Sequence, residues 1–289
     1  MNRETTDAFG AQYGMVAAAM FALGLAAFGA GNASADTLKD ALKRGYIEIG
    51  IGNAPPWAEM TSDGEITGGA PDVTIAVLKK LGIKEVRAKV VEYGSMIPGL
   101  QAKRFDVVAA GLFMKPERCA AVSYSLPDVC GTEAFAVKKG NPHNLKSFKD
   151  VAMSGATLAV CGGCVEEGYA RDAGVPLDRI VTVPDEQSAI KMVSDGRVDA
   201  YAYPTVSIAG LLMKGGYDDL EMVTPIENTP VGCGGAAFRK GDTAFRDAYD
   251  AELKKMQESR EFAEILGKYG FPSDIAMQTS REELCGGPN

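Results

Sequence analysis

Two successive runs of alternating strand and helix patterns constrain this chain more than any other feature of its sequence. The first run has a β-branched strand pattern at residues 46–51, helical apolar spacing at residues 71–81 and a buried strand pattern at residues 105–110. The second run repeats this order of elements over residues 158–203. Such alternation produces parallel sheets with crossover helices, so we predict an α/β fold with two similar lobes.

Short extended segments rich in small residues follow each run, and they predict two crossings of the chain between the lobes. The chain would leave lobe 1, build lobe 2 and return, with the helical stretch at residues 243–267 packing on lobe 1. This layout places a cleft between the lobes, and paired linking strands can act as a hinge. The predicted boundaries are residues 36–134 and 239–289 for lobe 1, 139–232 for lobe 2, and 135–138 and 233–238 for the hinge strands.

The N-terminal residues predict export from the cytoplasm. Residues 15–28 form an apolar stretch that is too short to span a bilayer comfortably, and Ala33-Ser34-Ala35 follows it with the small-x-small form of a cleavage site. We therefore expect residues 1–35 to be a signal peptide and the mature protein to be periplasmic.

The charge balance excludes some classes of partner. The 289 residues carry a net charge of −8 and a pI near 4.9, and no run of five basic residues occurs. An acidic surface argues against nucleic acid or an anionic membrane as the main partner.

Six cysteines occur, and the sequence does not choose among their pairings. Cys161 and Cys164 form a CxxC pattern, which alone is compatible with a redox pair, half a zinc site or a structural disulfide. Pairings of Cys119 with Cys130 and of Cys233 with Cys285 are open alternatives. Zinc would need further ligands, and the chain has one histidine, so we predict no metal and no cofactor.

An arginine and three aromatic residues are the best candidates for ligand contacts. Arg118 follows a buried strand and a proline-containing turn, and its planar fork suits a carboxylate. Trp57, Tyr93 and Phe113 occupy loop positions after strands, which face the cleft in parallel sheets. Aromatic faces around a cation add attraction of about 0.5–2 kcal/mol each.

Several motifs together resemble the periplasmic solute-binding proteins of ABC importers, of the polar-amino-acid type. The resemblance covers residues 37–285. Its motifs are Pro55-Pro56-Trp57, Gly68-Gly-Ala-Pro-Asp72, Tyr93-Gly-Ser-Met-Ile-Pro-Gly-Leu100, Phe105-Asp-Val-Val-Ala-Ala110, Lys115-Pro-Glu-Arg118, Tyr124-Ser-Leu-Pro127 and Asp195-Gly-Arg-Val-Asp-Ala200. Within the family, Gly111-Leu-Phe-Met-Lys-Pro-Glu-Arg-Cys119 and Glu92-Tyr-Gly-Ser-Met-Ile-Pro-Gly-Leu100 are most similar to the ectoine- and hydroxyectoine-binding branch.

The resemblance implies a type II periplasmic-binding-protein fold, with two α/β lobes joined by two hinge strands. It implies a monomeric, non-catalytic protein that captures a small zwitterionic solute, ectoine or hydroxyectoine, and delivers it to ABC permease subunits in the inner membrane. The implied ligand-binding residues are Trp57, Tyr93, Phe113, Arg118, Gly111, Val165 and Tyr203.

Three departures from the family patterns bear on the ligand. Amino-acid binders of this family have an acidic residue shortly after the strand at residues 198–203, where this chain has Pro204. No acid from lobe 2 is therefore expected, which fits a cyclic amidinium better than a primary ammonium. The ectoine branch has a Glu at Ala54 and a Thr at Val165, so this chain lacks two of its polar contacts. Glu59 or Glu166 is the alternative source of the lost acid.

Alternative functions remain open at this stage. The ligand could be a polar amino acid or a quaternary-ammonium solute, which has no N–H to satisfy. A periplasmic dehydratase-like enzyme could use the same fold, but no catalytic set of residues emerges. A redox protein built on Cys161 and Cys164 is the third alternative.

Overall fold

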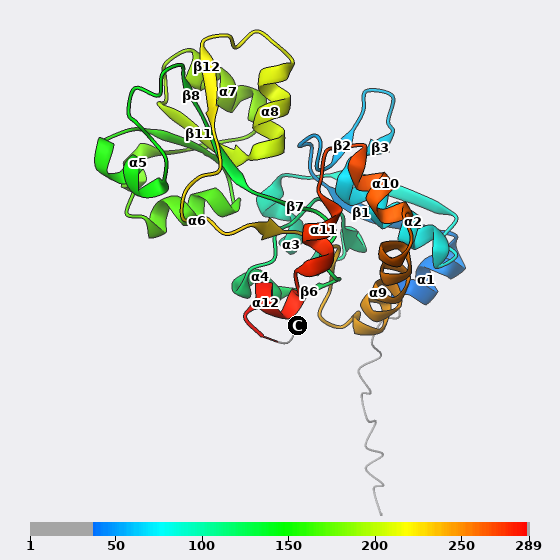
Figure 1. Ribbon diagram of the computed structural model, residues 1–289. Helices are drawn as coiled ribbons and strands as arrows, with labels where there is room; N and C mark the ends of the chain where they lie inside the picture. Colours follow the sequence, from blue (N-terminus) through cyan, green and yellow to red (C-terminus); the bar gives the residue numbers. More distant parts are fainter. Residues whose placement is uncertain (1–36, 288–289) are drawn as a thin grey trace, which may run out of the picture. The chain divides into compact units, whose positions relative to one another are not determined.

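A computed structural model describes residues 37–287 as two α/β lobes, each built on a five-stranded sheet (Figure 1). The predicted signal peptide, residues 1–35, lies outside the described residues. Within the described part of the chain, no helix is long and apolar enough to cross a membrane. The predicted α/β class and two-lobed architecture are confirmed.

The first sheet has the strand order β4-β1-β5-β14-β6. Strands β4 and β5 run parallel to β1, whereas β14 is antiparallel to both of its neighbours. The strands are β1 (Tyr46–Ile51), β4 (Glu85–Val90), β5 (Val107–Val108), β6 (Ser123–Tyr124) and β14 (Ala237–Phe238). The helices of this lobe are α1 (Thr37–Arg44), α2 (Gly69–Lys80), η1 (Tyr93–Ser95), α3 (Met96–Gln101), α4 (Pro116–Ala121), α9 (Thr243–Glu258), α10 (Glu261–Gly267), α11 (Ser273–Gln278) and α12 (Arg281–Cys285). A hairpin of β2 (Glu59–Met60) and β3 (Ile66–Thr67) lies between β1 and α2 in the sequence.

The second sheet has the strand order β10-β9-β11-β8-β12. Strands β10, β9 and β11 are parallel, and β8 runs antiparallel to β11 and β12. The strands are β8 (Glu133–Lys138), β9 (Leu158–Cys161), β10 (Ile180–Val183), β11 (Ala200–Pro204) and β12 (Leu220–Val223). The helices are α5 (Phe148–Ser154), α6 (Val165–Asp172), η2 (Leu177–Arg179), α7 (Glu186–Ser194) and α8 (Thr205–Met213).

Alternating side chains divide the core of the second lobe into two layers. Successive residues of a strand point to opposite faces of the sheet. In β11, Tyr201 and Tyr203 accordingly join the cluster under α7 and α8, whereas Ala200 and Ala202 join the cluster under α5 and α6. Figure 1 shows these two pairs of helices on opposite sides of β8 and β11. The central strands β9 and β11 are therefore buried on both faces, and α6 begins shortly after the end of β9.

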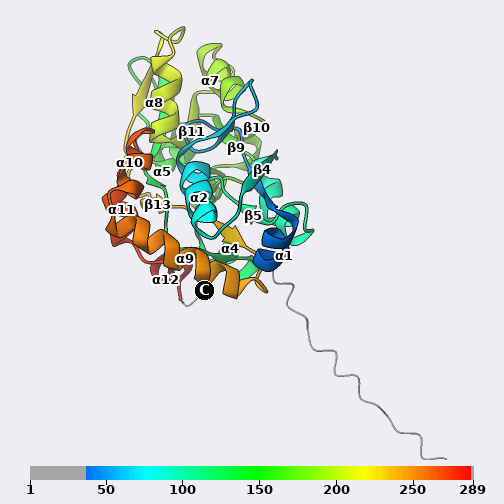
Figure 2. The same ribbon diagram turned by 90° about the vertical axis from the view of Figure 1, so that its right-hand side faces the viewer.

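The C-terminal helices pack on the first lobe, as the helical pattern predicts. Figure 2 shows α9 beside α2, and the hydroxyl of Tyr249 in α9 donates to Oγ1 of Thr74 in α2 at 3.2 Å. The predicted helix at residues 243–267 is divided into α9 and α10 at Ser259 and Arg260.

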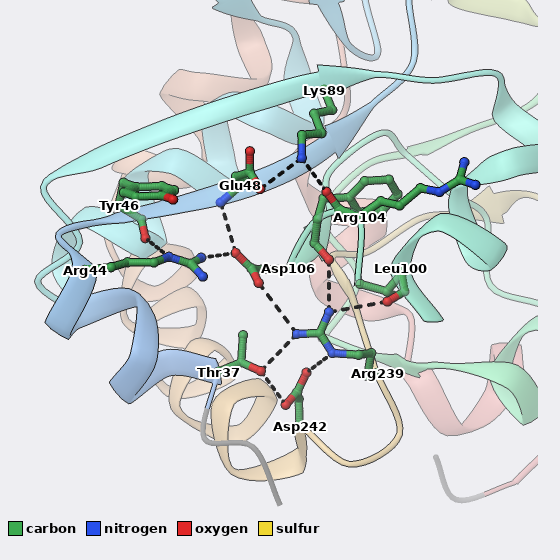
Figure 3. A network of polar contacts seen from close by, with 11 residues as sticks. Thr37, Arg44, Tyr46, Glu48, Lys89, Leu100, Arg104, Asp106, Arg239 and Asp242 are labelled. Carbon is green, nitrogen blue, oxygen red and sulfur yellow. Dashed lines mark hydrogen bonds and ion pairs between the residues drawn. The ribbon is translucent and has the colours of Figure 1, made fainter. Parts of the chain in front are cut away.

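A polar network fastens the returning chain to the start of the first lobe (Figure 3). The guanidinium of Arg239 donates to the carbonyls of Phe105 and Leu100 at 2.9 and 3.3 Å and to Oγ1 of Thr37 at 2.9 Å. It also pairs with Asp242 at 2.9 Å. Because these donors and acceptors come from four separated segments, the chain after β14 is held in lobe 1.

The first predicted hinge segment is misplaced. Residues 135–138 belong to β8, where they pair with both β11 and β12 in the centre of the second lobe. A separate ribbon of β7 (Cys130–Gly131) and β13 (Gly232–Cys233) lies between the two sheets along the chain. The sequence alone does not separate these segments, because a short ribbon and a buried strand share the same extended, small-residue pattern.

Two of the three disulfides differ from the pairings of Cys119 with Cys130 and of Cys233 with Cys285, whereas the bond between Cys161 and Cys164 is among the alternatives that the sequence left open. Cys130 pairs with Cys233 across the β7–β13 ribbon, Cys119 in α4 pairs with Cys285 in α12, and Cys161 pairs with Cys164. Two of these bonds join segments that are 166 and 103 residues apart. They depend on tertiary neighbours, which spacing in the sequence does not reveal.

Asp128 should make the stability of the protein depend on pH. Its side chain is fully buried; Oδ1 accepts from the backbone N–H of Val129 at 2.7 Å, and Oδ2 has no partner among the described residues. Burial raises the pKa of Asp128 from 3.8 to about 7. The carboxyl group of Asp128 ionises at lower pH in the unfolded chain than in the folded protein. Its contribution therefore lowers the free energy of unfolding as pH rises from about 4 to about 7.

We expect Asp128→Asn to remove this dependence. Denaturant unfolding at pH 4.5 and pH 8 should show the variant gaining on the native chain by up to about 4 kcal/mol at the higher pH. Asp178→Asn, at an exposed position, is the control and should follow the native chain. Parallel pH profiles for Asp128→Asn and the native protein would contradict the assignment.

Candidate functional site

A cavity of about 350 Å³ is lined by residues of both lobes. Lobe 1 contributes residues from the ends of β1 and β5 and from η1, and lobe 2 contributes the start of α6 and the end of β11. The lining residues are Ala54, Trp57, Tyr93, Ala110, Gly111, Phe113, Cys164, Val165, Glu166, Tyr203 and Pro204. Six of the seven residues predicted to contact ligand, all except Arg118, are among them.

Trp57 forms the apolar floor of the cavity on the lobe 1 side. Its indole packs edge-on against Phe113, with ring centroids 5.3 Å apart, and against Phe271 at 4.7 Å. Gly111 has a φ of +63°, and a Cβ there would lie 2.5 Å from Cε3 of Trp57. Glycine at position 111 therefore satisfies a left-handed backbone and also leaves room for the indole. Phe271, which sequence reasoning missed, comes from the distant C-terminal segment.

Arg118 lies directly behind the cavity lining. Its side chain is buried, with Nη1 donating to the carbonyl of Phe113 and Nη2 to the carbonyl of Gly163, both at 2.8 Å. Its guanidinium carbon lies 5.4 Å from the centroid of the Tyr93 ring. Arg118 thus joins lobe 1 to lobe 2 and contacts two residues that line the cavity.

The tyrosine of η1 closes the space between the arginine and the cavity. The hydroxyl of Tyr93 lies 3.4 Å from the backbone N of Phe113 and 3.5 Å from the carbonyl of Gly111. Burial raises the pKa of Tyr93, so its hydroxyl stays neutral at physiological pH. Its ring therefore offers an uncharged π-face to a ligand.

Lobe 2 supplies a second aromatic surface. Tyr203 stacks on Tyr201 with ring centroids 5.2 Å apart, and both are buried. The adjoining Pro204 also lines the cavity, at the position where an acid is expected in amino-acid binders. Neither the ring of Pro204 nor its nitrogen can donate a hydrogen bond.

A buried acid from lobe 2 does line the cavity, which corrects the expectation of none. Glu166, in the first turn of α6, is 1% exposed and is hydrogen bonded to the carboxyl group of Glu133 at the start of β8. Burial and the neighbouring carboxyl group hold the pKa of Glu133 well above its ordinary value. Burial also raises the pKa of Glu166, although the hydrogen bond from Glu133 and the nearby Arg118 act in the opposite direction.

The hydrogen bond between Glu133 and Glu166 requires a proton on one of the two carboxyl groups. Burial raises the pKa of both groups, so the pair carries at most one negative charge. Oε2 of Glu166 has no hydrogen-bond partner among the described residues. At most one negative charge therefore lies in this part of the cavity wall, near the positive charge of Arg118.

A wider chamber adjoins the cavity through Ala54, Tyr93 and Tyr203, which line both. It is open to solvent, and its charged lining residues are all acidic: Glu92, Asp185 and Glu186. Burial raises the pKa of Glu186 to about 7. This chamber is the solvent-facing approach to the smaller cavity.

The two lobes touch at the rim of these spaces. Oγ of Ser207 donates to the carbonyl of Pro55 at 3.2 Å, and a Cβ on Gly163 would lie 2.9 Å from Cα of Gly94. Glycines at positions 94 and 163 thus permit backbone contact between lobes.

Metal-ligating side chains do not gather into a cluster in the described part of the chain. Among residues 37–287 no cluster of His, Cys, Asp and Glu has the arrangement to hold a metal ion. His143 instead pairs with Asp199 at 3.1 Å, at a part-exposed position of the second lobe.

Comparison with known proteins agrees with this geometry. The family described as bacterial extracellular solute-binding proteins, family 3, matches residues 47–272. The probable amino-acid ABC transporter periplasmic-binding protein y4tE of Sinorhizobium fredii (strain NBRC 101917 / NGR234) is 38% identical over 264 residues, 88% of this chain and 87% of that protein. The L-cystine-binding protein TcyJ of Escherichia coli (strain K12) is 27% identical, covering 81% and 85%.

Solved structures extend the comparison. The crystal structure of EhuB in complex with hydroxyectoine is 52% identical, has a TM-score of 0.85, and the match covers 86% of this chain and 98% of that one. The ancestral amino acid-binding protein AncCDT-1, a precursor of cyclohexadienyl dehydratase, is 27% identical with a TM-score of 0.72, covering 81% and 99%. The sequence motifs, the two-lobed fold and these matches agree: the chain belongs to family 3 of the bacterial extracellular solute-binding proteins.

Proposed function

We propose that this protein captures ectoine or hydroxyectoine between its two lobes and delivers it to the permease of an ABC importer. The observation that carries the proposal is one cavity with an arginine behind it, aromatic faces around it and the Glu166 carboxylate at its edge. Ectoine is a cyclic amidinium that carries a carboxylate. Its two charged groups match Arg118 and Glu166, and its ring matches the aromatic faces.

Arg118 would bind the solute carboxylate after exchanging one of its two present acceptors, the carbonyl of Phe113, and would keep the other, the carbonyl of Gly163. Both of these are backbone carbonyls, and a carboxylate forms stronger, charge-assisted bonds with a guanidinium. Glu166 would accept an N–H from the amidinium, a role for which the ectoine branch has a Glu at the position of Ala54. The aromatic residues Trp57, Tyr93, Phe113 and Tyr203 would enclose the ring, with Gly111 and Val165 completing the walls.

The location and assembly of the protein follow from the same proposal. The mature chain would act in the periplasm as a monomer, without catalysis, and its lobes would move about the β7–β13 ribbon. The hydroxyectoine complex of EhuB and the ABC transporter assignment of y4tE support this proposal.

A quaternary-ammonium solute or polar amino acid is the second candidate. Ala54 and Val165 leave the cavity with fewer polar groups, which suits a ligand without N–H donors. Calorimetric titration with ectoine, hydroxyectoine, glycine betaine and polar amino acids distinguishes the candidates. Native mass spectrometry of the purified protein provides a check through any retained solute.

Arg118→Ala should weaken ectoine binding by about a hundredfold or more, because it leaves a buried carboxylate unpaired. Isothermal titration calorimetry measures the effect. Arg171→Ala, on the exposed side of α6, is the charge-matched control and should bind like the native chain. Unchanged affinity in Arg118→Ala would refute the carboxylate role.

Glu166 should make ectoine affinity pH-dependent. The raised pKa of Glu166 means that its carboxylate takes up a proton at higher pH than an ordinary glutamate. Affinity should therefore be constant at high pH and fall as pH decreases toward that pKa. Glu166→Gln should bind more weakly and lose this dependence, whereas betaine, which has no N–H, should be less sensitive in the native protein. Identical pH profiles for ectoine in both proteins would count against Glu166.

Gly111→Ala should displace Trp57, the single tryptophan of the chain. The matched control is Gly140→Ala, which has a φ of +82° and no atom within 4 Å of the added Cβ. Both variants should lose about 1 kcal/mol of stability to backbone strain. Only Gly111→Ala should shift the indole fluorescence and weaken solute binding; equal behaviour of the two variants would exclude a packing role for Gly111.

A further inference from the structure

The turn that joins β9 to α6 is closed by a disulfide. Cys161 and Cys164 are bonded to each other, and the backbone N–H of Cys164 donates to the carbonyl of Cys161 at 3.2 Å. Between them, Gly163 has a φ of +76°, a conformation that L side chains rarely adopt. Two adjacent glycines make a flexible link, and the disulfide adds a covalent restraint to the hydrogen bond that the N–H of Gly163 donates to Glu167.

This turn is also the part of lobe 2 that holds Arg118. The carbonyl of Gly163 accepts from Nη2 of Arg118 at 2.8 Å, and Gly163 lies against Gly94 of lobe 1. Cys164 lines the solute cavity, and Cys161 lines the solvent-facing chamber. The position of the guanidinium is therefore linked to the covalent state of the cysteine pair.

Among the six cysteines, all of which lie in the described residues, Cys161 is the most exposed. The other two disulfides are enclosed: Cys130 and Cys233 are 0% exposed, and Cys119 and Cys285 are 4% and 9% exposed. Cys161 is only part-buried, and the chamber gives it access to solvent. Exposed disulfides are those that exchange readily with thiols, and Cys164 is the N-cap of α6, where a helix stabilises a thiolate.

We propose that the Cys161–Cys164 bond is a thiol–disulfide exchange site for a dithiol reductant, and that its opening weakens solute binding by releasing the Gly163 carbonyl from Arg118. The effect on binding rests on the proposed solute-binding function. Cys161 and Cys164 are positioning residues in this proposal, since they act through Gly163 and Arg118.

The exchange is balanced in atoms and electrons. A thiolate of the reductant attacks Sγ of Cys161, forms a mixed disulfide and expels Sγ of Cys164 as a thiolate at the N-terminus of α6. The second thiol of the reductant, as its thiolate, attacks the reductant sulfur of the mixed disulfide, which releases the Cys161 thiolate. The reductant becomes a cyclic disulfide and loses two electrons and two protons, and the two cysteines gain them as thiols.

The test compares hydroxyectoine binding by the oxidised protein and by protein treated with limiting dithiothreitol. Alkylation and peptide mass spectrometry should find Cys161 and Cys164 reduced first. Calorimetry should then show affinity lowered by about tenfold, the effect of weakening one charge-assisted hydrogen bond. Cys161→Ser/Cys164→Ser should bind like the reduced protein with or without reductant. Cys119→Ser/Cys285→Ser should keep the full response.

A further variant distinguishes an effect on the position of Arg118 from a general loosening of the protein on reduction. Arg118→Lys keeps the positive charge but loses the fork that reaches both carbonyls. Its affinity should be lower and should no longer depend on the state of Cys161 and Cys164. An equal redox response in Arg118→Lys would overturn the positioning role, as would prior reduction of another disulfide or unchanged affinity after reduction.

Failure of the proposed function would be visible separately. If the oxidised protein binds none of the zwitterions, the solute assignment fails. The coupling between the Cys161–Cys164 disulfide and Arg118 can then be tested without ligand by amide hydrogen exchange. Exchange at residues 162–164 and 93–95 should become faster when the disulfide is reduced. Unchanged exchange at both segments would overturn it.

Discussion

The structure depends on one buried guanidinium that bonds to both lobes. Arg118 donates to the carbonyl of Phe113 in its own lobe and to that of Gly163 in the other, while its face lies against Tyr93. A buried arginine is stable only when its donors are used, and its planar fork fixes the directions of its partners. The neighbouring Cys119 is bonded to Cys285, which links α4 to α12. This bond fixes the position of α4, the helix that carries Arg118. Two residues that line the cavity, Tyr93 and Phe113, are therefore positioned with respect to this group.

The periodic parts of the fold could be predicted from the sequence. Strand β1 has the predicted bounds, and α2, predicted at residues 71–81, begins two residues earlier and ends one residue earlier. These elements could be predicted from local hydrophobic periodicity and from the glycines that end helices. The hinge segment could not be predicted, because residues 135–138 look alike whether they cross between lobes or lie in the centre of β8. The disulfides could not be predicted either, since Cys130 meets Cys233 only through the register of β7 and β13.

The candidate site, like the fold, could be predicted from the sequence only in part. Trp57, Tyr93 and Phe113 follow strands of one sheet, and the carboxyl ends of parallel strands meet at one edge, so their convergence could be expected. Glu166 was harder to place, since its charge depends on Glu133, which is 33 positions earlier and in another element. A glutamate in the first turn of a helix is ordinarily a solvated residue that favours the helix dipole. Only the packing of α6 against the start of β8 shows that this one is enclosed.

The charges enclosed at the site explain why a zwitterion would be the suitable ligand. Arg118 contributes one positive charge, and the Glu133–Glu166 pair contributes one negative charge when one of its two carboxyl groups is ionised, so the two groups then balance. A purely cationic or anionic solute would add an unpaired charge to a buried space, at considerable cost in free energy. A solute with both charges keeps the balance and gives each buried group a partner of opposite sign. The same balance makes the position of Arg118 decisive: a shift of the Gly163 carbonyl separates the two charges that the solute must join.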